Sequence, residues 1–153
     1  GTEYNPDTRR VASPYPEMSL EEIKNIKLPI AENCVLWLWT TNAFMEDALK
    51  ILRTWGFEPK TILTWAKNKL GIGYWLRGQT EHCILAIKGE PIYDQEKAAS
   101  YSTLLMANVG KHSEKPKEFY DLVDAVCVGW KLEYFGRKER EGWHVFGTEE
   151  ELA

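Results

Sequence analysis

The feature that most restricts the fold of this chain is an apolar run that leads directly into an amphipathic segment. Residues 34–41, CVLWLWTT, stay apolar until they reach two threonines, which is typical of a strand buried on both faces. Residues 42–57 then carry Phe44, Ala48, Leu52 and Trp55 at helical spacing. Asn42 is the predicted cap of this helix and Gly56 its predicted stop, so a strand is followed at once by a helix.

The same alternation continues along the chain. Further strands are predicted at residues 60–68, 81–89, 131–137 and 143–147. A short helix should begin at Ser19, with Glu22 as its capping-box partner. A longer helix should begin at Ser113, with Pro116 in its first turn. Strands that alternate with helices predict an α/β fold, in which helices cover both faces of a sheet.

Length and composition favour a single domain with a real core, spanning residues 1–153. No apolar run approaches the roughly 20 residues that a membrane helix needs, so no membrane partner is expected. Cys34, Cys83 and Cys127 are far apart in apolar surroundings and are predicted to be free thiols of a reducing compartment. That compartment would be the cytoplasm for a bacterial or phage protein and the nucleus for a eukaryotic one.

Two of the predicted strands end with a tryptophan beside polar residues, namely Trp39 and Trp65. Ligands of α/β sheets bind outside the carboxyl ends of the strands, where a flat ligand with polar edges would fit these residues. The alternative is that both tryptophans are ordinary core. The net charge of −4 argues mildly against a stand-alone nucleic-acid binder. Basic residues such as Arg77 could still line a cleft, or could simply be solvated surface charge.

Six strings occur in order along nearly the whole chain: SPYPEMSLEEI, VLWLWTTN, TWAKN, GYWLRGQTEHCILAIKG, SEKPKEFYDLV and KLEYFGRKEREGWHVFG. Together they resemble the adenine-N6 methyltransferase family, and the short loops are similar to its compact bacterial and phage members. The resemblance implies a Rossmann-like sheet that binds S-adenosylmethionine (SAM). It implies transfer of the SAM methyl group to the exocyclic N6 amine of adenine in DNA or RNA.

The resemblance also implies roles for individual residues. Those matching the family's substrate site are Tyr15, Trp39, Trp65, Lys67 and Glu81. Those matching its SAM site are Ser113, Lys115, Glu133, Tyr134, Arg137, Thr148 and Glu149. Thr148 departs from the family's usual asparagine, which puts that ribose contact in doubt. Plainer alternatives exist: Tyr15 as a loop anchor, Lys115 as a solvated lysine in a helix's first turn, and Arg137 in a strand-end ion pair. Glu81, His82 and Cys83 are adjacent residues of metal-ligand type, but neighbours on a strand point to opposite faces, so no metal is expected.

The family's acidic motif, Asp-Pro-Pro followed by an aromatic residue, does not occur in these 153 residues. The nearest string, Asn5-Pro6-Asp7-Thr8, is not a substitute, so no catalytic residue is assigned here. We expect an upstream segment to carry the motif. The alternatives are an inactive homologue that binds nucleic acid or scaffolds a methyltransferase complex, and an α/β protein that binds SAM or another nucleotide for a different purpose. The expected partners are adenine-containing nucleic acid, DNA ahead of RNA, and a related subunit in a homo- or heterodimer.

Overall fold

The computed structural model describes residues 19–25, 31–111, 114–129, 131–134 and 141–146, and the statements below concern these residues. The chain separates into two compact units. One unit spans residues 19–128, and the other combines residues 1–18 with 129–153.

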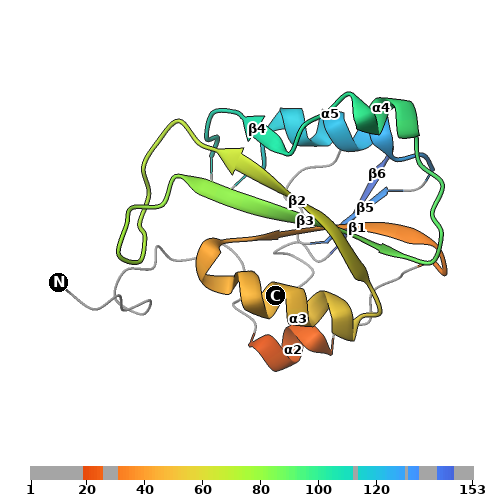
Figure 1. Ribbon diagram of the computed structural model, residues 1–153, viewed down its shortest axis with the longest axis horizontal. Helices are drawn as coiled ribbons and strands as arrows, with labels where there is room; N and C mark the ends of the chain where they lie inside the picture. Colours follow the sequence, from red (N-terminus) through yellow and green to blue (C-terminus); the bar gives the residue numbers. More distant parts are fainter. Residues whose placement is uncertain (1–18, 26–30, 112–113, 130, 135–140, 147–153) are drawn as a thin grey trace. The chain divides into compact units, whose positions relative to one another are not determined.

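The larger unit is built on a four-stranded sheet in the order β1-β3-β2-β4 (Figure 1). Its strands are β1 (Cys34–Thr40), β2 (Glu58–Ala66), β3 (Thr80–Lys88) and β4 (Leu104–Met106). Strand β3 is antiparallel to both β1 and β2, whereas β4 is parallel to β2. The carboxyl ends of β1, β2 and β4 therefore lie at one end of the sheet, together with the start of β3.

Helix α3 (Met45–Thr54) packs on one face of the sheet (Figure 1). Its Ala48 and Leu52 form a core with Phe57, Ile84 and Ala86, which confirms the amphipathic pattern for these helix positions. The predicted stop is also confirmed. Gly56 has φ +87°, and the N–H groups of Gly56 and Phe57 bond the carbonyls of Arg53 and Leu52, which is a Schellman motif.

Two predictions at the start of this helix are wrong. The chain first forms a 3₁₀ turn, η1 (Asn42–Phe44), whose N-cap is Thr41. Asn42 does not cap a helix, because its side-chain oxygen lies 2.6 Å from Nε2 of His82 and is used there. Phe44 is 52% exposed and does not join the buried face, because it lies in that turn, ahead of α3.

Helix α5 (Lys117–Val126) packs on the other face, and the short helix α4 (Gln95–Ala99) packs against α5 (Figure 1). Helices on both faces confirm the predicted α/β architecture. Pro116 is the N-cap of α5, with ψ 152°, and not part of its first turn. Lys115 therefore precedes the helix, which removes the alternative that placed it inside the first turn. Ser113 lies outside the described residues.

Burial differs among the strands in a way that the apolar pattern did not predict. Strand β3 is the most enclosed, with Cys83, Ile84 and Ala86 fully buried. Most residues of β1 are only partly buried, because β1 is one of the two outer strands of the sheet that is described. The prediction of a strand buried on both faces thus fits β3 and is wrong for β1.

The loop of residues 67–79 joins β2 to β3 and projects beyond the sheet in Figure 1. It closes where the Gly71 N–H donates to the carbonyl of Gly78. A Cβ atom at Gly73 would lie 1.8 Å from the carbonyl oxygen of Leu76, so only glycine fits there. The loop also holds Trp75, which is 93% exposed.

The remaining elements are short. Helix α2 (Leu20–Lys24) begins at the predicted cap, where Ser19 Oγ accepts from the Glu22 N–H. The Glu22 carboxylate accepts from the Ser19 hydroxyl, where a full capping box would use the backbone N–H of Ser19. In the smaller unit, β5 (Lys131–Tyr134) and β6 (Trp143–Phe146) pair in parallel, as two of the predicted strands. No helix among the described residues is long and apolar enough to cross a membrane.

Candidate functional site

Strand register brings four of the predicted site residues to one face of the sheet. Trp65 on β2 stands opposite Glu81 on β3, and Trp39 on β1 stands opposite Cys83. Because side chains alternate along a strand, Glu81 and Cys83 point to the same face. This is the face that α5 covers, since Trp39 contacts Phe119 of that helix with ring centroids 5.0 Å apart. Lys67 follows two residues after Trp65, just beyond the end of β2.

The two tryptophans form the aromatic part of the site. Their rings meet edge to face, with centroids 6.1 Å apart and an interplanar angle of 76°. Trp65 is only 1% exposed, and its indole N–H donates to the carbonyl of Ala107 at 2.8 Å. Trp39 is partly buried, and among the described residues its buried indole N–H finds no hydrogen-bond partner. The buried indole N–H of Trp37 is likewise without a partner among the described residues.

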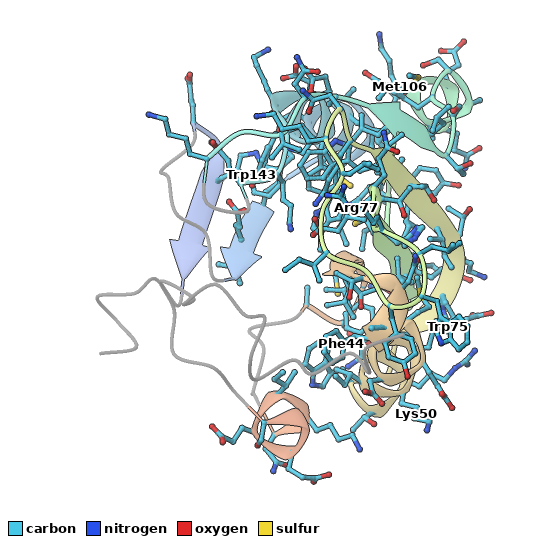
Figure 2. All side chains as sticks on the ribbon, turned by 90° about the vertical axis from the view of Figure 1, so that its left-hand side faces the viewer. Phe44, Lys50, Trp75, Arg77, Met106 and Trp143 are labelled. Carbon is cyan, nitrogen blue, oxygen red and sulfur yellow. The ribbon has the colours of Figure 1, made fainter. Side chains whose placement is uncertain are left out.

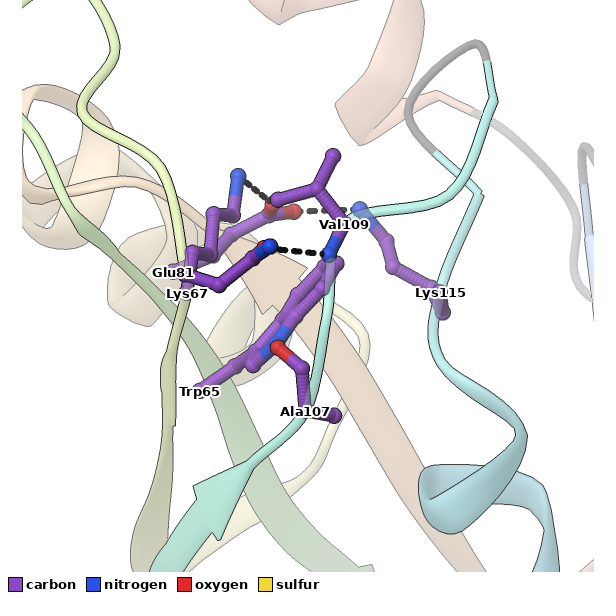
Figure 3. A network of polar contacts seen from close by, with 7 residues as sticks. Trp65, Lys67, Glu81, Ala107, Val109 and Lys115 are labelled. Carbon is purple, nitrogen blue, oxygen red and sulfur yellow. Dashed lines mark hydrogen bonds and ion pairs between the residues drawn. The ribbon is translucent and has the colours of Figure 1, made fainter.

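Glu81 forms the ionic part of the site, between two lysines (Figure 3). Lys67 Nζ lies 3.0 Å from one carboxylate oxygen of Glu81, and Lys115 Nζ bonds the other. Burial alone would raise the pKa of Glu81, but the Lys115 and Lys67 ammonium groups outweigh burial and hold the pKa below its ordinary value. Glu81 is therefore an ionised carboxylate near neutral pH, and it can only accept hydrogen bonds.

Each lysine also lies against a tryptophan. Lys67 Nζ is 4.8 Å from the ring centroid of Trp65, and Lys115 Nζ is 5.1 Å from that of Trp39. Both distances suit cation–π attraction. The cluster thus holds two ammonium groups and one carboxylate, and its net charge of about +1 favours an anionic group in a ligand. Among the described residues, no group of three or more His, Cys, Asp or Glu side chains could hold a metal ion.

The structure therefore brings together five of the predicted site residues, Trp39, Trp65, Lys67, Glu81 and Lys115. Glu133 is partly buried on β5 of the smaller unit, and the backbone of Tyr134 ends the same strand. The other predicted site residues, together with the side chain of Tyr134, lie outside the described residues: Tyr15, Ser113, Arg137, Thr148 and Glu149.

Sequence reasoning missed a second group of residues at this end of the sheet. The side-chain oxygen of Asn68 accepts from the N–H of Val109 at 2.8 Å, and the Gln79 amide donates to the carbonyl of Lys67 at 3.0 Å. Lys67, Asn68 and Gln79 line a cavity of about 280 Å³, together with Met106 and Asn108. The one available signal was that Asn68 ends the string TWAKN, directly after Lys67.

These features define an α/β protein whose strand ends carry an aromatic and cation-rich candidate site. The profile of the MT-A70 family matches residues 4–149, and the chain belongs to this family. That assignment confirms both the recognised family resemblance and the SAM-dependent methyltransferase fold class expected from it.

Relatives of known name support the assignment. The type II methyltransferase M.MunI of a Mycoplasma species is 32% identical over 142 residues, which cover 88% of this chain and 59% of that protein. The human N(6)-adenosine-methyltransferase catalytic subunit METTL3 is 29% identical over 149 residues, covering 89% of this chain and 25% of METTL3. The Drosophila melanogaster MT-A70-like N(6)-adenosine-methyltransferase is 30% identical over 148 residues, covering 89% and 24%. The chain thus spans between about a quarter and three fifths of these relatives.

Proposed function

We propose that this chain forms the core of an enzyme that transfers a methyl group from SAM to the exocyclic N6 amine of adenine in a nucleic acid. Membership of the MT-A70 family and relatives named as N(6)-adenosine methyltransferases support the reaction. The single observation that carries it is the position of Glu81, an ionised carboxylate between two lysines and beside two tryptophans at the strand ends.

Glu81 is proposed to receive the adenine amine. A carboxylate has about four acceptor positions, and the two lysines occupy one on each oxygen. The remaining positions can accept an N–H of the amine and fix its orientation. Trp39, which is the less buried of the two tryptophans, is proposed to contact the adenine ring. Trp65 is proposed to hold Trp39 in place through their edge-to-face contact, because the Trp65 ring is enclosed and its N–H is bonded to the carbonyl of Ala107.

The SAM site is proposed to include Lys115. Its ammonium group has three donors, one of which bonds Glu81, and its side chain remains 20% exposed. The excess positive charge of the cluster fits a carboxylate such as that of SAM. When bound, SAM would supply the electrophilic methyl group. The family resemblance adds Ser113, Glu133, Tyr134, Arg137, Thr148 and Glu149 to this site.

The group that accepts the proton released by the adenine amine is proposed to come from outside this sequence. The family's Asp-Pro-Pro-aromatic motif does not occur in the 153 residues, and Glu81 is already held by two ammonium groups. We propose that an upstream segment supplies it. The alternative is a non-catalytic subunit that binds nucleic acid beside an active partner, which the absence of the motif would also explain.

The test compares the 153-residue chain with the product of its complete gene, using isotopically labelled SAM and adenine-containing DNA and RNA oligonucleotides. We expect the complete product to label N6 of adenine and the 153-residue chain to bind without turnover. Binding without turnover in both would favour the non-catalytic subunit. Absence of labelling and of SAM binding in both would refute the proposed function.

A matched pair of lysines tests the SAM site by calorimetry on the complete product. Lys115→Ala should weaken SAM binding by about 1.5–3 kcal/mol, the usual scale for hydrogen bonds to charged groups. Lys117→Ala should leave binding unchanged, because Lys117 is 80% exposed and pairs with Asp121 on the surface. Equal SAM affinity in the two variants would show that Lys115 does not hold the cofactor.

A further inference from the structure

The cavity beside the site lies where a nucleic-acid substrate must continue. It is lined by residues at the ends of β2 and β4 and by Gln79, directly before β3. Lys67 lines the cavity and also bonds Glu81, so this residue is shared by the cavity and the proposed adenine site. A strand whose target adenine contacts Glu81 has to place its adjoining nucleotides on the neighbouring surface.

We propose that this cavity binds the nucleobase next to the target adenine and so contributes to sequence selectivity. The inference rests on the proposed function and concerns the same site. Its chemistry is that of base recognition, because Asn68, Gln79 and Asn108 contribute three carboxamides to the lining. Carboxamides carry a donor and an acceptor on one plane, which matches the paired groups on a base edge.

Internal hydrogen bonds already fix two of these amides. Asn68 uses its oxygen to accept from Val109, which leaves its NH₂ group for a ligand. Gln79 uses its NH₂ group to donate to Lys67, which leaves its oxygen as an acceptor. The cavity lining therefore includes a donor, the NH₂ group of Asn68 after β2, and an acceptor, the side-chain oxygen of Gln79 before β3. Fixed groups of this kind bind with a smaller loss of side-chain entropy.

Met106 supplies an apolar wall that the folded chain leaves exposed. It is 75% exposed on β4 (Figure 2) and lines the cavity with the small residues Ala66 and Ala107. A thioether packs favourably against an aromatic ring, and the alanines leave room beside it. The cavity, at about 280 Å³, is open at the surface and suits a single base better than a longer ligand.

The test uses the complete gene product and single-stranded oligonucleotides with one central adenine, in which each neighbouring position carries each of the four bases. Dissociation constants come from fluorescence anisotropy, and methyl transfer is measured on the same set. We expect the best and worst neighbouring bases to differ by roughly 5- to 150-fold in affinity, the range for a pair of hydrogen bonds to one base edge, here from Asn68 and Gln79 together. Methyl transfer should follow the same order.

Three variants locate the selectivity. Gln79→Ala and Met106→Ala should each reduce the ratio between best and worst bases at least threefold, and the exposed Met106 keeps the test valid should Gln79→Ala fail to fold. Gln95→Ala is the control, because Gln95 is an exposed glutamine on α4 outside the cavity. Equal affinity for all neighbouring bases, or an unchanged ratio in Met106→Ala, would overturn the inference. Selective binding without methyl transfer would instead refute the proposed reaction and leave the base site standing.

Discussion

Replacing Glu81 with glutamine should destabilise the fold more than the same substitution at an exposed, ion-paired glutamate. The Glu81 side chain is 12% exposed, and the two lysines that it pairs with are 27% and 20% exposed. Removing one partner of a fully buried ion pair costs about 3–5 kcal/mol. Because the lysines here keep some contact with water, we expect about 2–3 kcal/mol for Glu81→Gln. For a chain of this size, that lowers the melting temperature by roughly 4–12 °C.

The stabilisation by the Glu81 ion pair should depend on pH. The pKa of Glu81 is lower in the folded protein than its ordinary value of 4.5, so the ion pair stabilises the fold fully above that pH. The contribution is lost as the pH falls through the lowered pKa of the folded state, since the carboxylate is then protonated. Wild type and Glu81→Gln should therefore differ at pH 7 and converge in acid.

Calorimetric melts of the 153-residue chain between pH 3 and pH 7 measure both effects. Glu46→Gln is the matched control, because Glu46 is 85% exposed and pairs with Lys50 one helical turn away. It should melt close to wild type at every pH. If Glu81→Gln melts at the wild-type temperature at pH 7, or if its deficit persists unchanged in acid, the ion pair does not stabilise the fold.

Three further predictions concern single residues of the larger unit. Asn68→Ala should lower the free energy of unfolding in urea by about 1 kcal/mol, whereas Asn68→Asp keeps the acceptor for Val109 and most of the stability; equal loss in both would show that the bond contributes nothing. Gly56→Ala should cost roughly 1–2 kcal/mol, because Gly56 has φ +87° and no close neighbour that clashes; an unchanged urea midpoint would contradict this. Burial raises the pKa of Cys83 well above its ordinary value, so its thiol should resist alkylation at pH 8 until the chain is unfolded, as peptide mass spectrometry can show; rapid labelling of the native protein would refute it.

Local pattern was sufficient for the helices and strands whose signals lie close together in the sequence. The cap of Ser19 and Glu22 joins residues three positions apart, and the Gly56 stop depends on the turn just before it. In both cases, the groups that must bond one another are neighbours along the chain. Periodicity likewise placed Ala48 and Leu52 in the core.

Tertiary contacts decided the positions that the pattern misplaced or missed. Asn42 has the chemistry of a cap, but His82, 40 residues away, takes its side-chain oxygen. Asn68 bonds the backbone of Val109, 41 residues away, which no local signal predicts. The burial of β1 depended on which strand became central, and the insertion of β3 between β1 and β2 settled it.

Lys115 is where the two sets of site residues meet. The family resemblance assigns Lys115 to SAM and Glu81 to the adenine, yet in the structure the two form one ion pair. A carboxylate that is shared with two ammonium groups keeps its charge, and an ammonium group that is tied to it cannot swing freely into solvent. The proposed roles of the two residues therefore predict that a change at either one alters both binding steps. Lys115→Ala should weaken adenine recognition as well as SAM binding, whereas loss of Lys67 leaves the Lys115–Glu81 bond in place and should affect SAM binding much less.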